Sequence, residues 1–132
     1  MRFAVDRLDH LVMTVKDVEI SAAWYQRVLG MERVDFGPHN RTAVRFGGQK
    51  INLRPAEATQ AEWWTGPAAA PGGQDLCFIV TVTAAQVIEH LHSCGVTVEQ
   101  GPAQKDGALG PITSVYCRDP DGNLIEIANY GD

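Results

Sequence analysis

A single carboxylate stands in the middle of an apolar stretch near the end of the chain. Glu126 lies within Leu124-Ile125-Glu126-Ile127-Ala128, whose other members are all hydrophobic. Burying a carboxylate costs free energy unless a cation, hydrogen-bond donors or a proton of its own compensates the charge. Strand alternation places Leu124, Glu126 and Ala128 on one face and the two isoleucines on the other. If the isoleucines pack under a helix, the Glu126 carboxylate points to the opposite face.

The chain contains an internal repeat. The strand-like segment His10–Val15 has a counterpart in Asp75–Val80, and each is followed by a helix-like segment that ends at a glycine, Gly30 or Gly95. The two strands are separated along the chain by the same distance as the two glycines, which favours a duplicated unit. His10 and Asp75 therefore occupy equivalent positions, as the heads of equivalent strands.

Each helix-like segment is bounded by residues that favour helix ends. Asp17 is placed to cap the first, and Thr83 with Gln86 forms a capping-box pattern at the start of the second. The strand-like stretches that follow are 32–36, 42–46 and 50–54 in the first half, and 97–100, 112–118 and 124–129 in the second. Gly47-Gly48 and Asp119-Pro120-Asp121-Gly122 have the residues that hairpin turns require. Each half therefore predicts a βαβββ module, and aligning the turns makes Asn52 the equivalent of Glu126.

The two modules predict an α+β protein with mixed sheets, organised as one domain over residues 1–132. We expect the first module over about 6–54 and the second over about 75–130. The segment 55–74 between them is rich in Ala, Pro and Gly and reads as a linker.

Composition limits the classes of function. The 132 residues are 45% hydrophobic and 20% charged, which is typical of a globular protein. A formal charge of -5 argues against a nucleic-acid or anionic-membrane surface. The chain does not start like a signal peptide, and its 3 cysteines lack CxxC spacing, so we expect a reduced, cytoplasmic protein. No GxSxG, HExxH, P-loop or GxGxxG pattern is present.

The paired βαβββ modules, the start "DHLVMTV" and the finish "RDPDGNLIEI" resemble the vicinal oxygen chelate superfamily. This superfamily includes glyoxalase, methylmalonyl-CoA epimerase, extradiol dioxygenases, and fosfomycin and bleomycin resistance proteins. The segments "QKINL", "DLCFIV", "EQGP" and "GPITSVYCRDPDGNLIEIANY" are similar to its glyoxalase-domain subgroup, which includes virulence-associated bacterial proteins. The resemblance implies that each module forms a cupped half-barrel.

The resemblance also implies one divalent metal ion, held by residues of the first and last strands of each module. Those positions are His10, Asp75 and Glu126, with Asn52 as a fourth ligand or a substrate contact. The family usually has His where this chain has Asp75, and often Glu or His where it has Asn52. The resulting set is rich in oxygen and suits Mn, Mg, Ni or Zn better than the Fe of oxygenases, so extradiol dioxygenase activity is disfavoured.

Each of these residues also has an ordinary structural interpretation. His10 could be a surface histidine, and Asp75 could be a turn residue after "PGGQ". Asn52 could be a hydrogen-bonded polar group of the core. Glu126 could form an ion pair with Lys50 or Arg54 across the cup.

Further residues are candidates for substrate binding. Lys50 and Arg54 share a strand face with Asn52 and would favour an anionic substrate. Ser114 and Tyr116 share a strand face and either contact substrate or are ordinary strand residues. Cys77 shares the face of Asp75 and lines the cavity or, alternatively, is a buried inert thiol.

By this resemblance the chain would be a glyoxalase-like, metal-dependent lyase or isomerase that acts on a small carbonyl compound, either anionic or conjugated to a thiol. Glu126 would be the base that moves a proton next to the carbonyl, and the metal would stabilise the enediolate. The alternative is a metal-free binding protein for a small molecule or antibiotic, as in the bleomycin resistance branch. Group transfer to an antibiotic ranks below both. Because the modules expose sheet edges and apolar faces, we also expect a homodimer.

Overall fold

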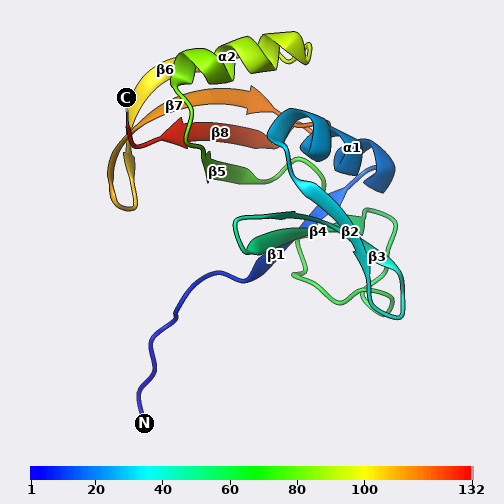
Figure 1. Cartoon of the computed structure of the whole chain (residues 1–132). Helices are drawn as coiled ribbons and strands as arrows, with labels where there is room; N and C mark the ends of the chain where they lie inside the picture. Colours follow the sequence, from blue (N-terminus) through cyan, green and yellow to red (C-terminus); the bar gives the residue numbers. More distant parts are fainter. Residues whose placement is uncertain (132) are drawn as a thin grey trace. The chain divides into compact units, whose positions relative to one another are not determined.

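The computed structural model describes residues 1–131, which fold into two compact units, Met1–Ala70 and a second that begins at Pro71 (Figure 1). The elements are β1 (His10–Val15), α1 (Val18–Leu29), β2 (Glu32–Phe36), β3 (Arg41–Phe46), β4 (Gln49–Pro55), β5 (Asp75–Ile79), α2 (Ala84–Ser93), β6 (Gln100–Gly107), β7 (Gly110–Arg118) and β8 (Leu124–Asn129). Each unit has the order βαβββ, so the α+β class and the repeat are confirmed.

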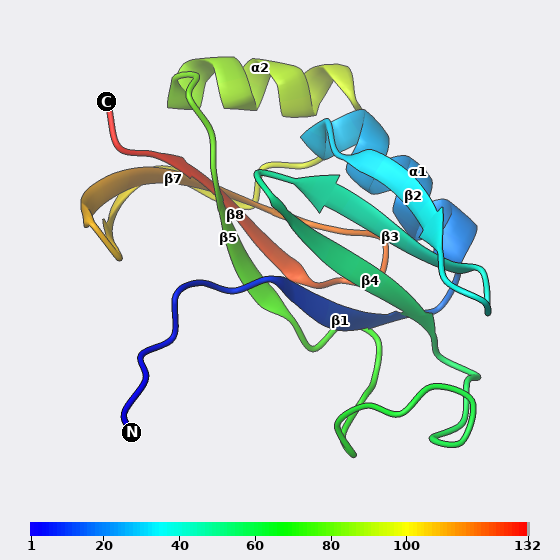
Figure 2. The ribbon, with the colours of Figure 1, turned by 60° about the horizontal axis from the view of Figure 1, so that its bottom comes forward.

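The first unit is an open, mixed sheet with one helix on one face (Figure 2). Its strand order is β1-β4-β3-β2, with β1 parallel to β4 and the other pairs antiparallel. The buried side of α1 includes Tyr25, whose hydroxyl donates to Met13 Sδ at 3.6 Å. Met13 pairs with Leu53, and both are buried on the helix side of the sheet. The alternate residues of β1 and β4 therefore lie on the other side.

The second unit repeats this arrangement, with strand order β5-β8-β7-β6 and β5 parallel to β8. The helix α2 packs on β7 and β8 and buries Val87 and Leu91. Ile125 and Ile127 are also buried, at 0% and 4% exposure. The isoleucines thus form the apolar layer beneath α2, and Glu126 between them projects from the opposite face, as the alternation predicted.

The helix ends are those that the sequence predicts. Asp17 accepts a hydrogen bond from the backbone N–H of Ile20 at 3.0 Å, and Thr83 and Gln86 form the complete capping box. Gly30 adopts the left-handed conformation after α1, with φ 66°, which satisfies carbonyls at the helix end. No helix within residues 1–131 is long and apolar enough to cross a membrane.

One predicted strand is wrong. The expected strand at 97–100 is replaced by β6, which begins at Gln100 and continues to Gly107. Gly101 and Pro102 argue against a strand interior, because glycine has no side chain to pack and proline has no N–H to donate. The structure accommodates them with a shift in the β6–β7 register between Gln100 and Ala103. β6 is the edge strand of the second sheet, so its residues border the face that carries Glu126.

Replacing Gly101 by Ala tests that irregularity. Gly101 has φ +112°, and an added Cβ would lie 2.5 Å from the carbonyl oxygen of Ser114. We expect Gly101→Ala to lower the free energy of unfolding by about 2 kcal/mol or more, measured by urea denaturation. Gly66→Ala is the control, because nothing lies within 4 Å of its added Cβ, and should change stability by less than about 0.5 kcal/mol. Equal effects would contradict the close approach.

Candidate functional site

The Glu126 carboxylate is surrounded by hydrogen-bond donors from its own sheet. In the register of the second unit, Glu126 lies opposite Cys77 on one side and Tyr116 on the other. The hydroxyl of Ser114, two residues before Tyr116, donates to Glu126 Oε2 at 2.5 Å. Tyr116 and Cys77 lie beside this carboxylate in the register, and its negative charge contributes to raising the pKa of both. Hydrogen bonding therefore compensates the charge of Glu126 within the apolar stretch of the sequence.

Two of these donors hold their protons well above neutral pH. Burial, followed by the hydrogen bond and negative charge of Glu126, raises the pKa of Tyr116 to about 12. Cys77 is exposed as a whole, but partial burial of its thiol, with the charges of Glu126 and Asp75, raises its pKa to about 11. Because a raised pKa in an acid means that the neutral form persists, both groups remain donors around pH 7.

This cluster lies at a pocket of about 560 Å³ within the second unit. Its lining residues are Cys77, Ile79, Lys105, Asp106, Gly107, Ala108, Ile112, Tyr116, Glu126 and Tyr130. The ammonium of Lys105 lies 5.7 Å from the centroid of the Tyr116 ring, so a cation stands beside the carboxylate cluster. The Tyr130 hydroxyl accepts from the backbone N–H of Leu109 at 3.1 Å and so ties down the turn after β6. The pocket combines apolar walls with one cation, Lys105, and two carboxylates, Asp106 and Glu126.

The predicted residues of the first unit lie on the face of its sheet away from α1. His10 heads β1, is 46% exposed in its side chain, and has Nδ1 2.8 Å from Asp9 Oδ1. Asn52 lies between Val12 and Ala43 in the register and is 7% exposed. Its Oδ1 atom is buried and has no hydrogen-bond partner within the described residues. Its oxygen is therefore an available acceptor, and its role as a ligand, a substrate contact or a core amide stays a prediction.

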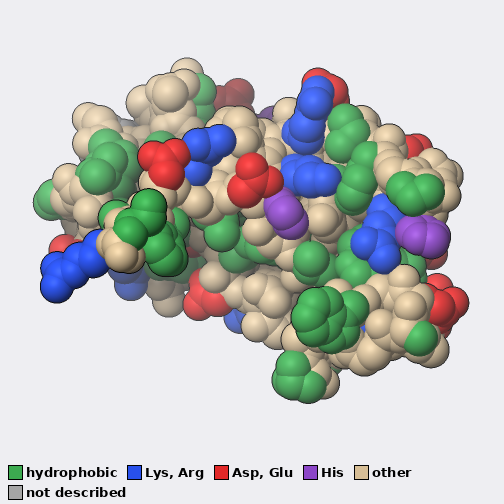
Figure 3. All heavy atoms as spheres, turned by 90° about the horizontal axis from the view of Figure 1, so that it is seen from below, with side chains coloured by type: hydrophobic (Ala, Val, Ile, Leu, Met, Phe, Trp, Pro, Cys, Tyr) green, Lys and Arg blue, Asp and Glu red, His purple; other side chains and the backbone are tan. Residues whose placement is uncertain are grey.

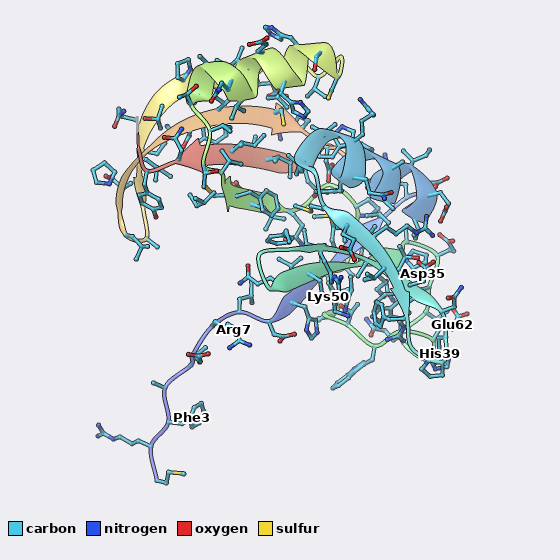
Figure 4. The ribbon with its side chains drawn as sticks, in the orientation of Figure 1. Phe3, Arg7, Asp35, His39, Lys50 and Glu62 are labelled. Carbon is cyan, nitrogen blue, oxygen red and sulfur yellow. The ribbon has the colours of Figure 1, made fainter. Side chains whose placement is uncertain are left out.

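Lys50 and Arg54 share the face of Asn52 but have partners in their own unit. Arg54 is buried, and its guanidinium donates to the carbonyls of Trp63 and Ala58 at 3.1 and 2.8 Å. It therefore holds the segment after β4 against the sheet. The Lys50 ammonium lies 3.4 Å from the centroid of the Phe36 ring, and Figure 4 shows it on the first unit. The substrate-binding roles of both residues stay predictions.

The structure thus brings together four of the predicted residues, namely Cys77, Ser114, Tyr116 and Glu126. Asp75 is exposed at the head of β5, on the face of Cys77. Cys77 is exposed and lines the pocket, so its interpretation as a buried thiol is wrong. Sequence reasoning missed Lys105 and Tyr130. A prediction of a strand over 100–107 would have revealed Lys105. It pairs with Ile112 in the register, and Ile112 shares a face with Ser114.

Comparison with known proteins identifies the family. Residues 7–127 match the Glyoxalase/Bleomycin resistance protein/Dioxygenase superfamily. Virulence protein STM3117 of Salmonella typhimurium (strain LT2) is 42% identical over 130 residues, covering 98% of this chain and 88% of that protein. Glyoxalase domain-containing protein RDO1 of Mycosarcoma maydis is 44% identical over 131 residues, covering 99% and 72%. The chain therefore belongs to this superfamily, as its sequence resemblance predicted.

Solved structures agree with the fold. Integron cassette protein VCH_CASS1, from the mobile metagenome of V. cholerae, aligns with a TM-score of 0.94 at 41% identity, covering 99% of this chain and 100% of that one. More distant structures share the fold alone. They include a lactoylglutathione lyase from Agrobacterium tumefaciens (TM-score 0.73, 22% identity, 96% of each chain) and the antibiotic-binding protein TnmS3 from Streptomyces sp. CB03234 (0.74, 21%, 97% and 98%).

A double-mutant cycle tests the hydrogen bond between Ser114 and Glu126. Ser114→Ala should lower the free energy of unfolding by about 1–3 kcal/mol, because it removes a donor to a charged group. In the Glu126→Gln background the same change should cost at least about 0.5 kcal/mol less. Ser93→Ala, at an exposed position of α2, is the control and should have an effect below about 0.5 kcal/mol. Additive effects of Ser114→Ala and Glu126→Gln would show that the two side chains are not coupled.

Proposed function

We propose that the chain is a glyoxalase-like lyase or isomerase that moves a proton at the carbon next to a carbonyl group, with Glu126 as the base. The observation that carries this proposal is the Glu126 carboxylate, held by Ser114 at 2.5 Å in a pocket of about 560 Å³. A general base must be fixed within reach of the substrate proton. Ser114 is fully buried and so fixes the carboxylate from one side.

In the proposed reaction the Glu126 carboxylate takes a proton from the substrate carbon, and the electron pair of the C–H bond moves toward the carbonyl oxygen. When the substrate carbon also bears a hydroxyl group, the isomerisation balances without any other reactant: the carbon-bound proton returns to the former carbonyl carbon, and the hydroxyl proton passes to the former carbonyl oxygen as the first carbon becomes the new carbonyl. Lys105 stands beside the cluster and would attract an anionic substrate or stabilise charge that develops on its oxygen. The apolar side chains of Ile79 and Ile112 would contact its carbon skeleton.

The proposed ligands are of the residue types that bind the divalent metal ion often found in the family. In the first unit, the engagement of His10 Nδ1 with Asp9 leaves Nε2 as the ligand atom, an arrangement common among metal-binding histidines. The buried Oδ1 of Asn52 has no partner among the described residues. The second unit supplies the carboxylates of Asp75 and Glu126. One nitrogen with three oxygens suits Ni, Zn, Mn or Mg. Such a metal would supply Lewis-acid stabilisation of the enediolate.

A metal-free binding protein for a small molecule or antibiotic is the second candidate. It is favoured by the hydrogen bond from the Ser114 hydroxyl, which compensates the charge of Glu126 without a cation. The structurally similar TnmS3 is an antibiotic-binding protein. Within residues 1–131, no group of three or more His, Cys, Asp and Glu side chains is close enough to share a metal.

We further propose that the protein works as a cytoplasmic homodimer on a small molecule, without nucleic-acid or membrane partners. On the face drawn in Figure 3, acidic and basic side chains are interspersed, with no continuous basic surface. This mixture agrees with the net charge of -5, which gives no long-range attraction to phosphate backbones.

Metal content and turnover test the proposal together. In untagged protein, we expect about one equivalent of a divalent transition metal by mass spectrometry, reduced in both His10→Ala and Glu126→Gln. With thiol conjugates of 2-oxoaldehydes or acyl-CoA epimers as substrates, Glu126→Gln should lower kcat by about 10²–10⁴-fold. Glu89→Gln, at an exposed position of α2, is the matched control and should change neither quantity.

Two results would overturn this proposal. Unchanged metal content and turnover in Glu126→Gln would remove its proposed role. No metal in the wild type, with no rise in Tm on adding Mn, Ni or Zn, would favour the binding protein, because a ligand that binds the native state must stabilise it.

A further inference from the structure

The exposed hydrophobic side chains are not scattered over the molecule. Ten large hydrophobic side chains are exposed among residues 1–131, and eight of them fall in two places. Met1, Phe3, Val5 and Leu8 belong to the segment before β1, which we call the arm (residues 1–8). Ile79, Val82, Leu109 and Tyr130 belong to the second unit, and we call them the patch. Grouped exposed apolar residues of this kind mark interaction surfaces.

The arm makes few contacts within its own chain. Phe3 is 89% exposed and Val5 81%. The side chain of Gln49 donates to the carbonyl of Leu8 at 2.8 Å, which fixes the root of the arm. Within the described residues no hydrogen bond joins residues 1–7 to a later part of the chain, since Arg7 bonds to its neighbour Asp6. In Figures 1 and 4 the arm, with Phe3 and Arg7 labelled, extends away from the sheet of the first unit.

Three residues of the patch, Ile79, Val82 and Tyr130, line a groove. A hollow of about 440 Å³ is lined by Ile79, Val80, Thr81, Val82, Thr83, Asn129, Tyr130 and Gly131. Ile79 and Tyr130 also line the pocket of Glu126, so the groove and that pocket share a wall. Leu109 joins the patch through its backbone N–H, which donates to the Tyr130 hydroxyl at 3.1 Å.

We propose that the arm of a second copy of this chain docks on the patch, with Phe3 in the groove between Val82 and Tyr130. In an extended arm, alternation places Phe3 and Val5 on the same side and Ala4 on the other. The arm can therefore present an apolar edge to the patch while its remaining side chains face solvent. The inference rests on the proposed dimer and is independent of the proposed chemistry.

The area and the charges agree with a second copy as the occupant. Phe3 alone would bury about 150–250 Å². In a two-fold dimer both arms dock on both patches, so the exposed side chains of Met1, Phe3 and Val5 on each arm and the four of each patch all contribute toward the roughly 1,000 Å² that a specific interface needs. The arm carries Arg2, and Asp106 lines the pocket that shares a wall with the groove, so a cation of the arm has an acidic partner near the patch.

Photocrosslinking tests the position of the arm. A benzophenone analogue of Phe is placed at position 3 in unlabelled protein, which is mixed with ¹⁵N-labelled protein before irradiation. We expect crosslinks to residues 79–83 or 129–131 in the heavy chain. The same analogue at position 20, an exposed site on α1, is the control and should not reach these peptides. Crosslinks confined to the same chain, or to other segments, would overturn the proposal.

Sedimentation equilibrium tests the energetics. Phe3→Asp and Val82→Asp should each raise the dimer Kd at least tenfold, because a carboxylate would enter an apolar groove. Ala4→Asp, on the other side of the arm, should raise it less than threefold. An unchanged Kd in Phe3→Asp would reject the arm and leave the dimer standing, whereas a monomeric wild type would reject both. Since metal content and turnover are measured separately, neither result decides the chemistry of Glu126.

Discussion

The second unit places one carboxylate, that of Glu126, in a largely apolar strand and surrounds it with polar groups from the neighbouring strands. Glu126 lies between two buried isoleucines, and its carboxylate accepts a hydrogen bond from the hydroxyl of Ser114, with Tyr116 and Cys77 opposite it on the two neighbouring strands. These groups reach the carboxylate because β7 and β5 flank β8 in register. A slip of one residue in either pairing would turn the donors to the helix side and leave the charge without compensation. The register and the site therefore specify each other.

The two faces of each sheet have different roles: one packs against a helix, and the other carries polar groups. The helix side is apolar and supplies hydrophobic stabilisation, as with Val87 and Leu91 of α2 over the isoleucines of β8. The opposite side is then free for polar groups that need hydrogen bonds or ligands. In the second unit the edge strand β6 contributes Lys105 to the pocket on this side of the sheet. Its irregular register lets the strand carry Gly101 close to the backbone of β7.

The sequence predicted the elements whose signals are local. Helix caps at Asp17 and Thr83 and the alternation around Glu126 depend on neighbouring residues, and the structure confirms them. The sequence did not predict β6, because Gly101 and Pro102 are unfavourable in a strand. The strand forms through its pairing with β7. That error also hid Lys105. The donors to Glu126 could be placed on a face, but the contacts among them come from long-range register, which a local pattern does not encode.

The two repeated units carry different residues at the equivalent positions 52 and 126, and the neighbouring side chains explain the difference. Asn52 and Glu126 occupy the same place in their sheets, but Asn52 is flanked by Val12 and Ala43 where Glu126 is flanked by Cys77 and Tyr116. A carboxylate at 52 would have no hydrogen-bond donor from the side chains of these two neighbours, and burying a neutral amide costs less than burying a charge. The remaining penalty, a buried oxygen without a partner, falls on the face that also carries His10. Such a cost is expected where a polar atom is retained for a ligand rather than for stability.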